Sequence, residues 1–122
     1  MLSLSGMKKS FQHAWKGLKF VYKSEQNFRF QVVVAIITLS LSIIFPLRNW
    51  EIIIIILLIL LVLVFEILNT AVEQLNDLLK PRMHHYVGVV KDAMAGAVFL
   101  TSLVALMVGL MIFLPHFINL LN

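Results

Sequence analysis

Four polar side chains stand at helical spacing directly after a long apolar run. Glu66, Asn69, Glu73 and Asp77 follow one another at intervals of three, four and four residues. Because an α-helix has about 3.6 residues per turn, this spacing places all four on one stripe of a helix. Carboxylates and an amide on one stripe can take up protons or bind a hard cation such as Mg²⁺.

The depth of each carboxylate in a membrane follows from its distance along the helix. If the helix enters at Glu51, Glu66 lies about 22 Å along it and Glu73 about 33 Å, at about 1.5 Å per residue. The hydrocarbon core is about 30 Å thick, so Glu66 lies just inside the far boundary, Glu73 at it and Asp77 beyond it. A solvated helix end explains Asp77. A carboxylate inside the bilayer costs at least a few kcal/mol, so Glu66 indicates a functional role.

Other polar groups are expected at the same membrane face. Glu25 precedes the first apolar block, and Lys91 and Asp92 open the last one. Carboxylates in a chain without cysteine favour Mg²⁺, which binds through one or two carboxylates plus phosphate oxygens, and a lysine can neutralise phosphate. The set predicts phosphoryl transfer at a membrane surface, with a carboxylate accepting the proton of a lipid hydroxyl.

Two other classes of function also fit a carboxylate in a spanning helix. A small proton-coupled transporter could use Glu66 as its proton site, although such proteins usually place a lone carboxylate near the midplane. A non-enzymatic membrane subunit is the other alternative, but it would not need Glu25, Glu66, Glu73 and Asp92 at one level. The clustering of these carboxylates toward one membrane face favours phosphoryl transfer over both alternatives.

Composition predicts an all-α integral membrane protein. Of the 122 residues, 61% are hydrophobic and 13% are charged, whereas soluble domains are usually about a quarter charged. Three long apolar blocks predict three transmembrane helices within a single membrane-embedded domain over 1–122. The expected spans are 28–45, 51–79 and 90–114. Lys80-Pro81 ends the second span, and a loop is expected over 82–89.

The segment before the first span is expected to form an amphipathic helix over 8–25. Phe11, Trp15, Leu18 and Tyr22 recur at intervals of four, three and four residues, and lysines recur every seven on another face. This pattern is typical of a helix that lies in the headgroup region.

The net charge of +4 indicates the membrane topology rather than binding to nucleic acid. Six of the ten basic residues precede the first apolar block, and none follows the third. The positive-inside rule then predicts a cytoplasmic N-terminus and an outside C-terminus, with no nucleic-acid partner. Small residues over 93–97 are expected to allow close approach of another helix. A spanning stripe this polar must face protein or water, so self-association is expected.

The polar stripe resembles a known family signature. Glu66-Ile-Leu-Asn-Thr-Ala-Val-Glu73, followed by Asp77, is similar to the motif of the small prokaryotic diacylglycerol kinases and undecaprenol kinases. Lys91-Asp92 with Ala95-Gly96-Ala97 resembles the family's second block. Ala14-Trp15-Lys16-Gly17-Leu18, with Glu25 and Phe28-Arg29 downstream, resembles its N-terminal block. The resemblance covers about residues 7–115, and the residues of these motifs are slightly closer to those of the undecaprenol kinase branch.

The resemblance implies an architecture and an activity. The family is a homotrimeric helical bundle of three-span subunits, each with an N-terminal surface helix, in the bacterial inner membrane. Its active sites are shared between neighbouring subunits. It transfers the γ-phosphate of ATP, with Mg²⁺, to the hydroxyl of diacylglycerol or undecaprenol at the cytoplasmic face.

The resemblance also implies residue roles. Glu66 would be the general base, with Asn69 beside it, and Glu25 and Glu73 would hold Mg²⁺. The lipid substrate would meet Trp15 as well as Glu66. The sequence departs from some relatives at His13, where they carry tyrosine, and at Gly6 and Val89, where they carry arginine. The residues that would contact ATP are His13, Glu25, Glu73, Asp77, Arg82, Met83, His84, Lys91 and Asp92.

Overall fold

The structure, a computed structural model, describes residues 3–82 and 84–122, and over these residues the chain forms four helices. They are α1 (Leu4–Ser24), α2 (Gln26–Ile44), α3 (Asn49–Leu79) and α4 (His84–Leu121). Helices α2, α3 and α4 are each long and apolar enough to cross a membrane. The prediction of an all-helical chain with three potential membrane spans is confirmed.

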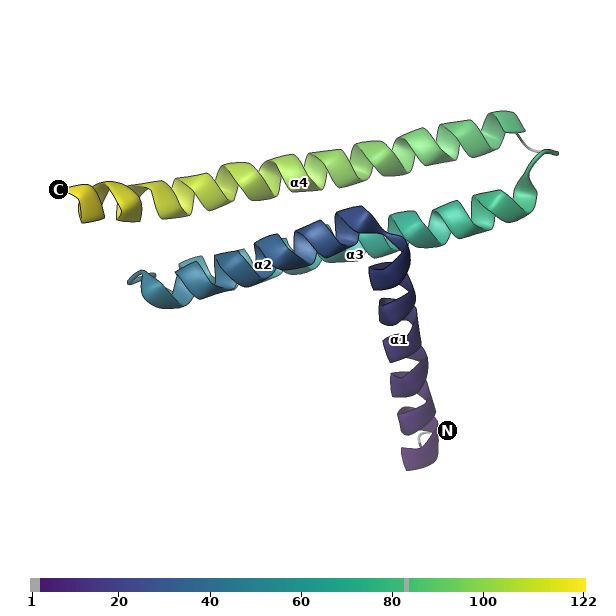
Figure 1. The fold of residues 1–122 in the computed structure, drawn as a ribbon, viewed down its shortest axis with the longest axis horizontal. Coiled ribbons are helices and arrows are strands. Elements are labelled where there is room, and N and C mark those ends of the chain that lie inside the picture. Colours follow the sequence, from purple (N-terminus) through teal and green to yellow (C-terminus); the bar gives the residue numbers. More distant parts are fainter. Residues whose placement is uncertain (1–2, 83) are drawn as a thin grey trace.

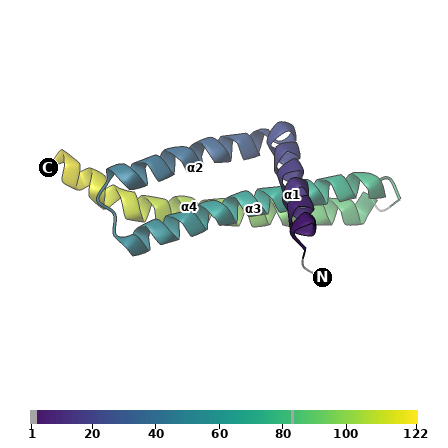
Figure 2. The same cartoon turned by 90° about the horizontal axis from the view of Figure 1, so that it is seen from below.

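Helix α3 is the element on which the others assemble. It packs against α2 and most extensively against α4, and the three run side by side (Figures 1 and 2). Helix α1 leaves this group crosswise from the start of α2 (Figure 1), and it also contacts α3. Among the described residues, no Cα atom of α1 or α2 lies within 8 Å of one in α4.

All four helices begin earlier than the sequence pattern predicts, α2 and α3 by two residues and the other two by four or more. Helix α1 starts at Leu4, because the Ser3 hydroxyl accepts a hydrogen bond from the Gly6 N–H at 3.0 Å and caps the helix. Helix α4 starts at His84, so the loop predicted over 82–89 is wrong for most of its length. Val87 is only 3% exposed, so the first turn of α4 buries an apolar side chain, although a glycine such as Gly88 inside a helix costs about 1 kcal/mol.

The small residues of α4 do not produce close packing within the chain. A Cβ atom added to Gly96 would meet nothing within 4 Å, and Ala93 and Ala95 are exposed. Helix α4 also continues through Pro115 to Leu121, beyond the predicted end at 114. At Ala93, Ala95 and Gly96, the close approach expected over 93–97 is therefore not made by any described helix of the same chain.

The apolar surface of the spans is largely uncovered. A core cluster of Ile55, Ile112 and Phe113 joins α3 to α4 near the end of the bundle that carries the α2–α3 turn. At that end Glu51 accepts a hydrogen bond from the Arg48 N–H at 2.9 Å and lies 3.7 Å from His116. In each span, 17% or less of the most apolar window is buried inside the chain. Lipid or other protein must cover the rest.

Candidate active site

Glu66 is a buried carboxylate with one polar side-chain partner among residues 3–82 and 84–122. It is 2% exposed, and its Oε2 atom accepts a hydrogen bond from Gln31 Nε2 of α2 at 3.3 Å. No lysine, arginine or histidine among the described residues forms an ion pair with it. A carboxylate that is buried without a cation is costly to keep charged, so the surroundings favour a group that exchanges a proton.

The corner between α1 and α2 places Glu25 beside α3. The Glu25 N–H donates to the Val21 carbonyl at 2.9 Å and ends α1. From the first turn of α2, Arg29 Nη1 reaches back to the carbonyls of Tyr22 and Lys23 at 2.8 and 2.9 Å. The last carbonyls of a helix have no partner within it, so this guanidinium caps α1 and fixes the angle of the corner.

Glu25, Glu66 and Glu73 come together at this corner. Burial raises the pKa of Glu25 above its ordinary value. That pKa is raised further by the nearby charge of Glu73, by a hydrogen bond between the two carboxyl groups and by the charge of Glu66. The charge of Arg29 lowers it. Like charges disfavour ionisation of one another only at short range. The structure thus brings Glu66 and Glu73 of α3 close to Glu25, which precedes Glu66 by 41 residues in the sequence.

Crowded carboxylates fit a divalent cation. Glu25 and Glu73 offer hard oxygen donors whose mutual repulsion a cation would relieve. Among residues 3–82 and 84–122, no group of three or more His, Cys, Asp or Glu side chains is arranged to hold a metal ion. A cation at Glu25 and Glu73 would therefore need further ligands from phosphate and water, as Mg²⁺ commonly does.

The rest of the polar stripe becomes more exposed along α3. Asn69, one turn after Glu66, is half-buried, as is Glu73, while Asp77 is exposed. Thr70, beside Glu66, is 1% exposed, and its hydroxyl donates to the Glu66 carbonyl at 3.1 Å. Asn76 is also buried, and its Nδ2 atom has no hydrogen-bond partner among the described residues.

In the described part of the chain, the remaining candidate residues for the nucleotide and for the lipid are not gathered in one place. His13 and Trp15 are exposed on α1, whereas Lys91 and Asp92 are exposed on α4. These two helices do not approach each other in the described part of the chain. Arg82 and His84 are exposed at the α3–α4 turn, and Met83 lies outside the described residues.

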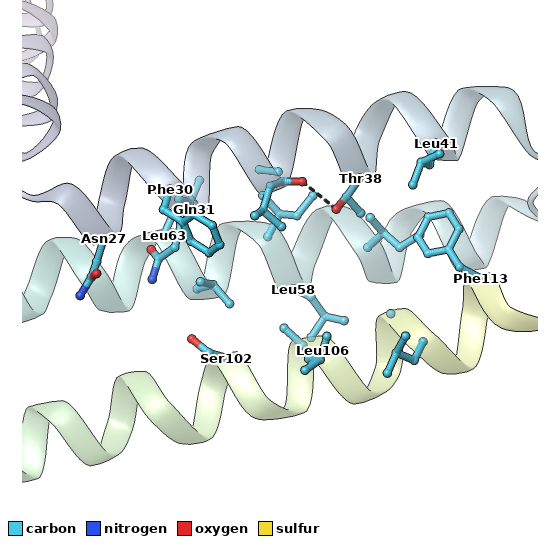
Figure 3. A pocket seen from close by; sticks show the side chains of 18 of the residues that line it. Asn27, Phe30, Gln31, Thr38, Leu41, Leu58, Leu63, Ser102, Leu106 and Phe113 are labelled. Carbon is cyan, nitrogen blue, oxygen red and sulfur yellow. Dashed lines mark hydrogen bonds between the residues drawn. The ribbon is translucent and has the colours of Figure 1, made fainter.

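A long apolar groove leads away from Gln31. It encloses about 560 Å³ between α2, α3 and α4, with Asn27 and Gln31 toward one end and Phe113 toward the other (Figure 3). Its polar lining is sparse: the Thr38 hydroxyl, for example, donates a hydrogen bond to the Val34 carbonyl of its own helix at 2.7 Å (Figure 3). A groove of this size and composition suits a hydrocarbon chain.

Gln31 is the residue of this site that the sequence pattern did not reveal. It lies inside the apolar block 30–45 and belongs to no polar stripe. The available signal was an amide at membrane depth, where an unsatisfied polar group is costly. That signal indicates a partner somewhere, but it does not say which helix supplies it.

The chain is similar to known lipid kinases over most of its length. Residues 12–113 match the family model described as prokaryotic diacylglycerol kinase. The undecaprenol kinase of Bacillus subtilis (strain 168) is 38% identical, over 88% of this chain and 87% of that protein. A diacylglycerol kinase of Synechocystis sp. is 30% identical, over 92% of this chain and 65% of that protein. A diacylglycerol kinase of Haemophilus influenzae is 32% identical, over 75% of this chain and 77% of that protein.

The crowding at Glu25 predicts a pH-dependent stability. The folded state holds the Glu25 proton to a higher pH than the unfolded state does. The contribution of Glu25 to stability therefore falls as pH rises from its ordinary pKa through the raised one. Glu25→Gln should raise the thermal unfolding midpoint at neutral pH in micelles containing a chelator, and the gain should vanish at low pH. A Glu25→Gln variant less stable than the wild type at neutral pH, without divalent cations, would contradict the repulsion between Glu25 and its neighbouring carboxylates.

Proposed function

This chain belongs to the prokaryotic diacylglycerol kinase family and is a lipid kinase, and we propose that it transfers the γ-phosphate of ATP to a membrane lipid hydroxyl. The reaction would take place at the cytoplasmic face of the bacterial inner membrane. One observation carries the proposal: Glu66, a carboxylate on a spanning helix, is 2% exposed and accepts only an amide hydrogen bond from the described side chains. Such a group suits the general base for an alcohol.

The proposed step is a direct phosphoryl transfer. The lipid hydroxyl gives its proton to the Glu66 carboxylate while its oxygen forms a bond to the γ-phosphorus. The bond between the γ-phosphorus and the bridging oxygen to the β-phosphate breaks, and ADP leaves with that electron pair. Positioning and charge neutralisation supply most of the rate in such transfers, so the protein's task is to hold the two substrates in line.

Glu25 and Glu73 are the proposed Mg²⁺ ligands. Their crowding at the α1–α2 corner supports this role. The bound ion would neutralise charge on the β- and γ-phosphates. Asn69 would position groups beside Glu66, and Lys91 and Asp92 would contact the nucleotide. His13, Asp77, Arg82, Met83 and His84 are proposed as its further contacts.

Undecaprenol is the proposed lipid, with diacylglycerol as the alternative. The apolar groove beside Gln31 supports a long hydrocarbon tail but not a particular one. The 38% identity to an undecaprenol kinase favours the polyprenyl alcohol. Trp15, exposed on α1, is proposed to meet the lipid at the membrane surface.

Helix α1 is proposed to lie in the membrane interface, with the N-terminus cytoplasmic and the C-terminus outside. Its crosswise direction relative to the spans supports this placement (Figure 1). So does a stripe of exposed apolar side chains along the helix, formed by Leu4, Met7, Phe11, Trp15, Leu18 and Tyr22.

A homotrimer with active sites shared between subunits is also proposed. Within one chain the candidate residues of α1 and α4 remain apart, and the spans leave most of their apolar surface uncovered. A neighbouring copy that brought its α4 to the α1–α2 corner would join Lys91 and Asp92 to Glu25, Glu66 and Glu73. The small residues at 93–97, unused within the chain, would allow that approach.

The activity itself can be measured by phosphate transfer to lipid. Purified protein in micelles would receive γ-labelled ATP, Mg²⁺ and either undecaprenol or diacylglycerol. We expect label in both lipids and faster transfer to undecaprenol. Folded protein that labels neither lipid would contradict the kinase proposal, and faster labelling of diacylglycerol would reverse the substrate assignment.

The shared site can be tested by mixing two inactive variants. Glu66→Gln and Lys91→Ala would be co-expressed with different tags and purified as mixed oligomers. Random assortment leaves about one quarter of shared sites with both residues intact, so about that fraction of wild-type activity should return. A site built within one chain would give no recovery, because each chain would keep its own defect.

A further inference from the structure

The Gln31 amide is oriented by Glu66 alone. Its Nε2 atom donates to Glu66 Oε2 at 3.3 Å, while its Oε1 atom is buried and has no hydrogen-bond partner among the described residues. A buried amide carbonyl without a partner is costly. The side chain therefore keeps its N–H on the carboxylate at the expense of its own acceptor. The contact with Glu66 determines how the amide is placed.

The same contact leaves half of the carboxylate available. Among the hydrogen bonds of the described residues, Oε2 is the Glu66 side-chain oxygen that has a donor. The terminal torsion of a glutamate is broad and soft, so a free carboxylate would rotate. A donor fixed on Oε2 directs Oε1 to one place, where an incoming hydroxyl could find it.

Gln31 also connects Glu66 to the apolar groove, because it hydrogen-bonds Glu66 and lines the groove. It lines the groove together with Asn27 and Phe30 (Figure 3), whereas Glu66 is not among the described residues that line it. A lipid whose tail occupied the groove would bring its hydroxyl end past the Gln31 amide before reaching Glu66.

We propose that Gln31 is a positioning residue: its Nε2–H holds Glu66 Oε2 so that Oε1 faces the lipid hydroxyl arriving from the groove. This inference rests on the proposed kinase activity. It adds a residue of α2 that takes no part in the transfer itself and acts through Glu66. Loss of the amide should misplace the base without disturbing the nucleotide.

Three variants separate positioning from mere structure. Gln31→Leu keeps the bulk and removes the donor, Gln31→His restores a ring N–H donor, and Ser42→Ala removes another buried polar group of α2. The Ser42 hydroxyl bonds to the Thr38 carbonyl and does not contact Glu66. The readouts are kcat with saturating lipid, KM for MgATP and the thermal midpoint in micelles.

We expect Gln31→Leu to lower kcat by about tenfold to a hundredfold, the usual effect of losing a hydrogen bond to a charged group. KM for MgATP should stay the same, Gln31→His should recover part of the loss, and Ser42→Ala should match the wild type. Wild-type kcat in Gln31→Leu would overturn the proposal. The proposal would also be overturned if kcat fell only in proportion to a lower thermal midpoint and did not recover in Gln31→His. If the wild type itself transfers no phosphate to lipid, the proposed function fails instead.

Discussion

The cost of burying the Glu66 carboxylate is the constraint on which the rest of the site depends. A charged side chain inside the bilayer costs at least a few kcal/mol, and one amide hydrogen bond offsets only part of that. A helix that carries such a group cannot face lipid on that side. Helix α2 covers Glu66 and supplies Gln31, and the α1–α2 corner brings Glu25 to the same place. The packing of α2 on α3 thus also covers the polar group that α3 carries.

The corner itself depends on one guanidinium. Arg29 belongs to α2 but caps the carbonyls of Tyr22 and Lys23 in α1, so two helices that run crosswise meet at a fixed angle. At this corner burial raises the pKa of Glu25, and the nearby Glu73 raises that pKa further. Helix α1, which is proposed to lie at the membrane surface, and the potential span α2 thereby contribute to one polar site at the proposed boundary between headgroups and hydrocarbon. This is where the phosphate of a nucleotide and the hydroxyl of a lipid can meet.

Periodicity and depth predicted the parts of this protein that a single helix determines. The stripe from Glu66 to Asp77 follows from spacing alone, and along it the side chains change from buried at Glu66 to exposed at Asp77. Contacts between helices were harder to predict. Gln31 lies in a run with no polar periodicity, and its pairing with Glu66 depends on how α2 is rotated. The start of α4 was missed because Val87 is buried only after the chain has turned back on α3. The small residues at 93–97 have a partner only in the proposed oligomer, which periodicity within one chain does not describe.

The proposed role of Glu66 is to take the hydroxyl proton and to do little else. The most direct measurement compares Glu66→Gln with the wild type in two assays, lipid phosphorylation at saturating substrates and equilibrium binding of MgATP. General bases contribute about a hundredfold or more, so kcat should fall by at least that factor while the Kd for MgATP stays within error. Retention of wild-type kcat, or an equal loss of nucleotide affinity, would contradict the account.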